Sequence, residues 1–441
     1  MTPIAVDTLL QPRWIVPVEP HGVVLEDHAL VVDEGRIHDL LPAGEARTRY
    51  RAGEVVELPA HALVPGFVNA HTHAAMTLFR GLADDLPLMT WLNDHMWPAE
   101  QRWVNETFVG DGTRLAAAEM IRGGTTCFND MYFYPDVTAR VTAGIGIRAV
   151  VGLIVLDFPT QWAGSPGEYL DKGVAVHDGF RDAPLVHTAF APHAPYSVSD
   201  EPLARVATLA EELDIPVHMH VHETAHEVQE SVSRYGRRPL ARLDAAGLLS
   251  HRLVAVHMTQ LEDDEIAAIA AQGVAVVHCP ESNLKLASGF CPVARLLAAG
   301  VPVALGTDGA ASNNDLDMLG ELHMAALLAK GVAGDATALA AADALRMATL
   351  EGAVALGIGG VTGSLVPGKA ADLAAVDLGA LETEPLYAPL SQLVYAADRR
   401  QVSDVWVAGR RLLNDRKLTT IDEAEVLRTA RAWQRRITGT P

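Results

Sequence analysis

Apolar runs alternate with segments of helical periodicity through the middle of the chain, about residues 63–364. Eight of these runs read as buried strands: LVPGFVNAH, TTCFNDM, IRAVVGLIV, LVHTAFAPH, PVHMHVH, LVAVHM, VAVVHC and PVALGTD. Between them lie segments such as EPLARVATLAEEL and EDDEIAAIAAQG, whose apolar positions repeat as on a helix. Eight strand–helix alternations predict an α/β fold, a (β/α)8 TIM-type barrel. A doubly wound open sheet is the alternative, but no GxGxxG follows the first strand to indicate dinucleotide binding.

The two ends of the chain have a different pattern. Residues 1–60 and 366–412 contain short β-branched runs between Gly, Pro and Asp clusters, which indicate strands and turns. A helix in IDEAEVLRTARAWQRR then closes the chain. We expect one small β-sandwich domain formed by both termini, with the limits 1–62 and 365–441 around a barrel of residues 63–364.

Composition narrows the class of protein. The 441 residues suffice for one large domain and a smaller one, and the net charge of −21 argues against a nucleic-acid or anionic-membrane surface. No apolar run reaches the roughly 18–20 residues of a membrane helix, and the N-terminus lacks the order of a secretory signal. The three cysteines, Cys127, Cys279 and Cys291, form no disulfide framework and fit a reducing compartment. We expect a cytoplasmic protein without nucleic-acid or membrane partners.

Polar residues stand where the predicted strands end, which is where a barrel places its catalytic groups. One His alone is more often a hydrogen-bonded core residue, but the repetition indicates a metal site. The strand-end residues are His71, His73, His193, His218, His220, His222 with Glu223, His257, His278 and Asp308.

The first strand predicts how the metal is held. His71 and His73 point the same way because side chains on a strand repeat every second residue. Imidazole nitrogen and carboxylate oxygen suit Zn²⁺ or another borderline divalent ion, which acidifies a water when one coordination position stays open. We expect the ligands to be His71, His73, one His of the fifth strand and Asp308.

Glu223 helps to choose among the three histidines of the fifth strand. A general base must reach the water without binding the ion, so the chain must turn after the ligand. Spacing favours His220, with His218 one pleat deeper in the core and His226 on the surface of the next helix. Asp308 is either a ligand or the base that takes the water's proton. The purely structural alternative is that Asp308 caps the N-terminus of the following helix.

The motifs together resemble a known family. VPGFVNAHTH, His220 with Glu223, His257 and LGTDGAASNN resemble the amidohydrolase superfamily, over nearly the whole chain. Within it, HTHAAMTLFRGLADDLPLMTWLNDHMWPAE, APHAPYS and SNLKLASG resemble the 5-methylthioadenosine/S-adenosylhomocysteine deaminases.

The resemblance implies one divalent metal per chain, usually zinc, and settles His220 as the ligand over its neighbours. It implies that Glu223 is the proton shuttle, that Asp308 takes a proton and that His257 contacts the ring or the water. It further implies that Glu100 holds the ribose hydroxyls, that His193 contacts the nucleoside together with Glu223 and Asp308, and that Trp91 lines the pocket. From the residues alone, Glu100 would be a surface carboxylate, His193 a turn residue and Trp91 a core residue. A homodimer or homotetramer is also implied.

One departure from the family concerns the substrate. Better-known members carry arginines after the third strand that can meet the homocysteine carboxylate, whereas this chain reads VVGLIVLDFPTQWAGSPGEYLDK there. We therefore expect 5-methylthioadenosine to be preferred, with adenosine and S-adenosylhomocysteine as further substrates; Arg148 stands at a strand start, far from the catalytic face. The alternatives are a deaminase or chlorohydrolase of guanine, cytosine or an s-triazine, and a non-catalytic scaffold.

Overall fold

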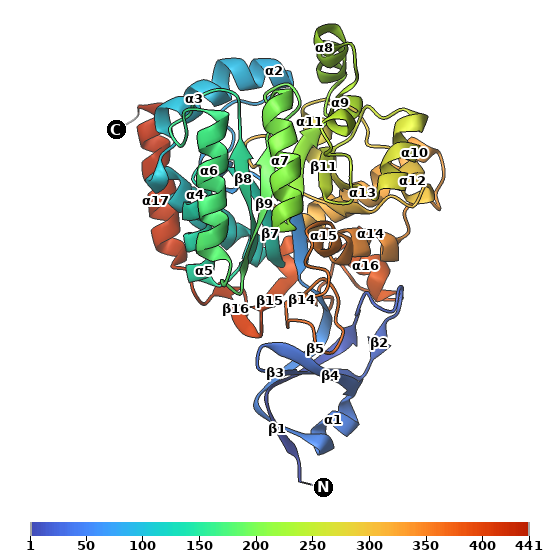
Figure 1. Cartoon of the computed structure of the whole chain (residues 1–441). Helices are drawn as coiled ribbons and strands as arrows, with labels where there is room; N and C mark the ends of the chain where they lie inside the picture. Colours follow the sequence, from blue (N-terminus) through green and yellow to red (C-terminus); the bar gives the residue numbers. More distant parts are fainter. Residues whose placement is uncertain (1, 440–441) are drawn as a thin grey trace.

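The protein, described here by a computed structural model covering residues 2–439, has a large barrel and a smaller β domain (Figure 1). The eight parallel strands of the barrel follow one another in chain order around the sheet. They are β6 (Phe67–Thr72), β7 (Thr125–Tyr132), β8 (Arg148–Val155), β9 (Val186–Pro192), β10 (Val217–Val221), β11 (Leu253–His257), β12 (Ala275–His278) and β13 (Val303–Leu305). The predicted (β/α)8 barrel is confirmed, and its strands are the eight apolar runs of the sequence.

Hydrogen bonds beyond the ladder draw the last strand to the first. The Asp308 backbone N–H donates to the His71 carbonyl at 3.0 Å, and the Asn69 side chain exchanges two hydrogen bonds with Thr307 at 2.8 and 3.0 Å. The backbones approach so closely here that a Cβ on Gly306 would lie 2.8 Å from the backbone nitrogen of His71. The closure places the ends of β6 and β13 side by side.

Helices surround the barrel (Figure 1). Those between the first and fifth strands are η1 (Ala74–Phe79), α2 (Leu88–Thr90), η2 (Trp91–Met96), α3 (Trp97–Trp103), α4 (Glu106–Arg122), α5 (Pro135–Ile145), α6 (Pro166–Phe180) and α7 (Asp200–Leu213). Those after β10 are α8 (Ala225–Tyr235), α9 (Pro239–Ala245), α10 (Asp263–Gln272), α11 (Pro280–Lys285), α12 (Val293–Ala298), α13 (Met318–Ala333), α14 (Ala341–Met347) and α15 (Leu350–Ala355).

Both ends of the chain build one mixed nine-stranded sheet, which confirms a small β domain shared by the termini. The N-terminal part contributes β1 (Ile4–Ile15), β2 (Leu25–Glu26), β3 (His28–Asp33), β4 (Arg36–Pro42), α1 (Ala43–Arg49) and β5 (Tyr50–Pro65). The C-terminal part contributes β14 (Leu373–Asp377), α16 (Pro389–Tyr395), η3 (Arg399–Gln401), β15 (Val402–Val407), β16 (Arg410–Asn414) and β17 (Lys417–Leu418). The two parts meet where β14 pairs antiparallel with β5. We propose the limits 1–62, 63–364 and 365–441 for these segments.

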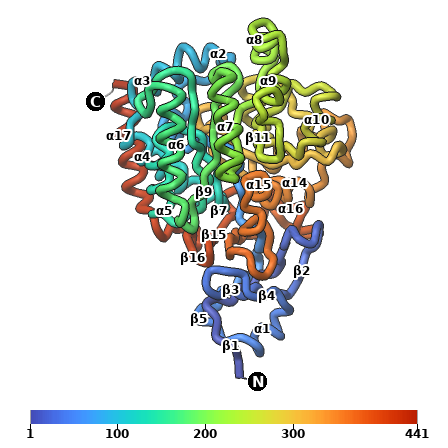
Figure 2. The backbone as a smooth tube through the Cα atoms, in the orientation of Figure 1, coloured from blue at the N-terminus to red at the C-terminus, as the bar shows by residue number. Residues whose placement is uncertain are grey.

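The last helix, α17 (Glu423–Thr438), lies against the barrel helix α4 (Figure 2). Trp433 is buried there beside Phe108, with ring centroids 5.2 Å apart, and its indole N–H donates to Asp111 at 2.9 Å. The C-terminal segment therefore contributes to both parts of the molecule: its strands belong to the β domain, and its last helix packs on the barrel.

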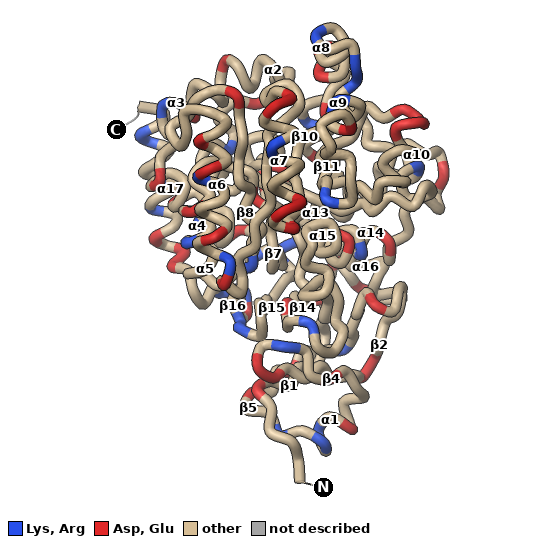
Figure 3. Tube along the Cα trace, in the orientation of Figure 1, with Lys and Arg blue, Asp and Glu red and all other residues tan. Residues whose placement is uncertain are grey.

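Charge and hydropathy agree with this arrangement. Lys and Arg positions are interspersed among Asp and Glu positions along the helices (Figure 3). Within residues 2–439, no helix combines the length and the apolarity needed to cross a bilayer.

Candidate metal centre and active site

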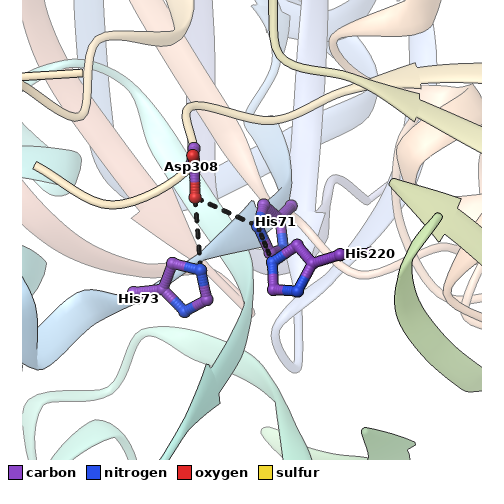
Figure 4. A group of neighbouring side chains, drawn as sticks. All are labelled: His71, His73, His220 and Asp308. Carbon is purple, nitrogen blue, oxygen red and sulfur yellow. Dashed lines mark hydrogen bonds and ion pairs between the residues drawn. The ribbon is translucent and has the colours of Figure 1, made fainter. Parts of the chain in front are cut away.

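Four side chains converge at the carboxyl ends of the barrel strands (Figure 4). His71 lies on β6, His73 directly follows it, His220 lies on β10, and Asp308 follows β13. One ligand atom from each of the four lies within 4.8 Å of the others. Both His71 Nε2 and His73 Nε2 are 3.2 Å from Asp308 Oδ1, and His220 Nε2 is 3.2 Å from His71 Nε2.

The far nitrogen of each imidazole has a partner of its own. His73 Nδ1–H donates to the Met131 carbonyl at 2.6 Å, and His220 Nδ1–H donates to the His193 carbonyl at 2.8 Å. His71 Nδ1 is 2.9 Å from His218 Nε2. With the protons on Nδ1, all three Nε2 lone pairs face the same point, the arrangement that metal-ligating histidines adopt. The donor set therefore fits a divalent ion such as Zn²⁺.

Asp308 is fixed by its second oxygen. Oδ2 accepts hydrogen bonds from the Ser282 hydroxyl at 2.6 Å and the Ser312 hydroxyl at 2.7 Å. The residue lies beyond the end of β13 and has a left-handed backbone, with φ of 60°, which is uncommon for a residue other than glycine. Oδ1 is thus left to face His71 and His73.

Glu223 and His257 stand beside this cluster. His257 Nε2 is 3.9 Å from Glu223 Oε2, and His257 Nδ1–H donates to the Asn283 side-chain oxygen at 2.9 Å. Burial, followed by the nearby charge of Asp308, raises the pKa of Glu223 to about 8. A carboxyl that keeps its proton near neutral pH can act as a general acid and then as a base.

The chain turns immediately after His220, as the spacing requires. β10 ends at Val221 and His222 has a φ of 53°, so Glu223 does not continue the strand alternation. The His222 ring points away from the metal cluster. Its Nε2 accepts a hydrogen bond from the Leu240 backbone N–H at 3.3 Å. His218 is fully buried behind His71, and His226 is exposed on α8.

A second buried carboxylate, Glu227, holds this turn. It accepts the backbone N–H of His222 at 3.1 Å and of Glu223 at 2.7 Å. Thr259 holds the other side, because its backbone N–H donates to the His222 carbonyl at 3.0 Å and its hydroxyl to the Glu223 carbonyl at 2.7 Å. Burial raises the pKa of Glu227 to about 8, against the effect of the two backbone donors.

A cavity of about 660 Å³ opens above the cluster. The described residues that line it include Glu100, Trp91 and His193 as well as Glu223, His257 and Asp308. Burial raises the pKa of Glu100 to about 7, and it lowers the pKa of His193 to about 3. The described lining includes no Lys or Arg.

A π-helix forms part of the cavity wall. Its hydrogen bonds span five residues, so Trp91 and Met96 at its two ends both face the cavity, together with Leu92. Outside it, the Trp97 and Phe158 rings lie 5.9 Å apart at the lining. The wall is therefore aromatic and apolar, which suits the flat face of a heterocycle.

Sequence reasoning left several contributors unassigned. Ser282 and Asn283, within SNLKLASG, orient Asp308 and His257. The threonine and glutamate of Thr224–Ala225–His226–Glu227 form a capping pattern that signals a helix start, and this pattern is the cue that could have found Glu227. Arg148, expected far from the catalytic face, is buried at the start of β8 in an ion pair with Asp372.

Comparisons with known proteins agree with this geometry. The family model described as the amidohydrolase family matches residues 62–412. A relative from Saccharophagus degradans, named 5-methylthioadenosine/S-adenosylhomocysteine deaminase, is 49% identical over 431 residues, which are 98% of this chain and 97% of its own. A relative of the same name from Thermodesulfovibrio yellowstonii is 41% identical over 434 residues, covering 97% of this chain and 98% of its own.

Solved structures give the same result. The chain resembles a zinc-bound structure described as an adenosine deaminase from Xanthomonas campestris, with 57% identity, a TM-score of 0.98 and coverage of 99% and 100% of the two chains. The fold is also similar to that of an atrazine chlorohydrolase from Arthrobacter aurescens, with 23% identity, a TM-score of 0.89 and coverage of 97% and 99%.

Proposed function

The chain belongs to the amidohydrolase family, and we propose that it is a metal-dependent hydrolytic deaminase of adenine nucleosides. The observation that carries the proposal is the convergence of three Nε2 lone pairs and one carboxylate oxygen beneath a cavity that also contains Glu223. A non-catalytic scaffold would have no use for a complete ligand set beside an acid–base residue.

We assign the ligands as His71, His73, His220 and Asp308, and the ion as Zn²⁺. When bound, this ion supplies Lewis acidity, which makes a water nucleophilic near neutral pH. Zinc is present in the similar adenosine deaminase structure from Xanthomonas campestris.

The reaction adds water at C6 of the adenine ring and releases ammonia, which leaves a hypoxanthine ring. Glu223 holds a proton near neutral pH and is placed to deliver it to N1, which opens the ring to addition. Asp308 accepts a proton from the adding water. His257, whose Nδ1–H is held by Asn283, presents Nε2 to the incoming oxygen. Each positioned proton transfer contributes about 10²–10⁴-fold.

Glu100 separates a nucleoside from a free base such as guanine or cytosine, or an s-triazine, because only a nucleoside has a ribose diol. We assign Glu100 to the diol, His193 to the nucleoside and Trp91 to the wall beside it. The test compares kcat/KM on adenosine and on 2′,3′-dideoxyadenosine. Above pH 7, where Glu100 is ionised, the wild type should favour the diol by about 10- to 100-fold, the value of hydrogen bonds to a charged group. Glu100→Gln should lose most of this preference. Equal rates on both nucleosides in the wild type would contradict the assignment.

We propose that 5-methylthioadenosine is preferred over S-adenosylhomocysteine, because the described cavity lining offers no cation to a carboxylate. Separate kcat/KM values for the two thioethers, with adenosine as reference, test this ranking. Gln161→Arg adds a guanidinium at the lining and should shift the ratio toward S-adenosylhomocysteine by about tenfold, whereas Gln161→Ala should not. A clear preference of the wild type for S-adenosylhomocysteine would refute the ranking.

We further propose that the protein acts in the cytoplasm as a homodimer or homotetramer. Light scattering of the purified protein tests the assembly, and fractionation of cells tests the location.

A further inference from the structure

The turn that carries Glu223 is held by the first turn of α8. Thr224 is the N-cap of this helix, and its hydroxyl accepts the Glu227 backbone N–H at 3.2 Å. In an ordinary capping box the glutamate returns to the N–H of the cap residue itself. Here the Glu227 carboxylate reaches past the cap to the two preceding residues, at 3.1 Å from the His222 nitrogen and 2.7 Å from the Glu223 nitrogen.

These two backbone groups need such a partner. They follow the last paired residue of β10, and the left-handed φ of His222 carries the chain away from the ladder. Glu227 takes both donors while Thr259 bonds both carbonyls, so every backbone polar group of residues 222 and 223 is fixed. Glu223 is buried, with its side chain 7% exposed, and its direction is set by a backbone that these hydrogen bonds hold in place.

We propose that Glu227 is a positioning residue, which acts on the reaction only by holding the backbone of Glu223 in place for proton transfer. The inference rests on the proposed deaminase function. Glu227 is 4% exposed and does not line the cavity, so it does not meet the substrate.

The chemistry of the side chain explains why a carboxylate is used. Two neighbouring backbone N–H groups require two acceptor oxygens, and each oxygen of the Glu227 carboxyl group keeps a lone pair that can accept one of them, whether or not the group is protonated. Glutamine has the same shape but one oxygen, so its NH₂ group would face a backbone N–H. Glu227→Gln therefore releases one backbone bond while it keeps the volume of the side chain.

The test is a double-mutant cycle with Glu223→Gln, using 5-methylthioadenosine as substrate. Glu227→Gln alone should lower kcat by about 10- to 100-fold, as expected for a misplacement on the order of 1 Å, with KM within about threefold. In the Glu223→Gln background, the same change should cost less than about threefold, because the group that it positions is already lost. Metal content per chain should not change in either protein.

Two further variants keep the test decisive. Ser231→Ala removes a partly buried hydrogen bond of the same helix, from the serine hydroxyl to the Arg237 carbonyl at 2.8 Å, and should leave kcat unchanged. Thr259→Val removes the hydroxyl that donates to the Glu223 carbonyl, together with its hydrogen bonds to Ser288 and Gln260, without altering Glu227. It should reproduce the fall in kcat if Glu227→Gln does not fold.

Three results would overturn the inference: equal losses in both backgrounds, a rise in KM at unchanged kcat, or activity that falls only in proportion to bound metal. Failure of the proposed function looks different, because the wild type itself would release no ammonia from adenine nucleosides.

Discussion

Replacing Arg148 tests whether this arginine serves the structure or the substrate. Its Nε donates to Asp372 Oδ2 at 2.8 Å and its Nη2 to Oδ1 at 3.2 Å, with the two side chains 2% and 0% exposed. Arg148→Met leaves the Asp372 carboxylate buried with one remaining donor, the Ala408 backbone N–H at 2.7 Å. Removing one partner of a buried pair typically costs about 3–5 kcal/mol, which for a chain of this length lowers Tm by about 3–5 °C.

The double variant Arg148→Met with Asp372→Leu separates charge from packing. Replacing both partners by apolar groups is often neutral, but the Ala408 N–H is then left unpaired at a cost of about 1–3 kcal/mol. The double variant should therefore be more stable than Arg148→Met alone. Calorimetry measures Tm, and kcat/KM on 5-methylthioadenosine and S-adenosylhomocysteine should keep its wild-type ratio because Arg148 does not line the cavity. A single variant as stable as the wild type, or a changed substrate ratio, would refute the reasoning.

Two further predictions concern pH and metal. Burial lowers the pKa of His278 to about 3 from the usual 6.5, so the unfolded chain binds a proton that the folded chain does not as the pH falls through this range. Below pH 6.5, the free energy of unfolding should therefore fall by up to about 1.4 kcal/mol per pH unit. Denaturant titrations should show that this free energy falls less steeply with decreasing pH in His278→Leu than in the wild type. Equal slopes in the two proteins would contradict the prediction. Removal of the metal by a chelator should abolish deamination and lower Tm, because an ion that binds only the folded state stabilises it, and added Zn²⁺ should restore both; full activity in metal-free protein would contradict the site.

The sequence predicted the parts of the molecule that local patterns determine. An apolar run that ends in His or Asp identifies both a buried strand and the functional end of a barrel, so the eight strands and the His71, His73 and Asp308 set could be anticipated. Spacing favoured His220 among the three histidines of the fifth strand, and the family resemblance settled the choice. Spacing showed that the chain must turn before Glu223, but it could not show how.

Other features depend on contacts that no local pattern reveals. His257 and Asp308 have left-handed backbones. His and Asp adopt this region more often than most residues, but it remains uncommon for them, so the sequence does not show which His or Asp takes it. The π-helix at Trp91 reads as an ordinary helix by composition. Arg148 and Asp372 are 224 residues apart, so their pairing becomes visible only when the β domain is seated on the barrel.

The shared sheet of the two termini has a consequence for synthesis on the ribosome. β14 begins about 300 residues after β5 ends, so the edge of β5 has no neighbour on that side until translation is nearly finished. At about 5–20 residues per second, the nascent chain exposes the edge that β14 later covers, residues 61–65 of β5, for about 15–60 s. An unpaired edge of this kind attracts other strands, so chaperone binding during translation should concentrate on the N-terminal segment, well before His220, Glu223 and Asp308 emerge.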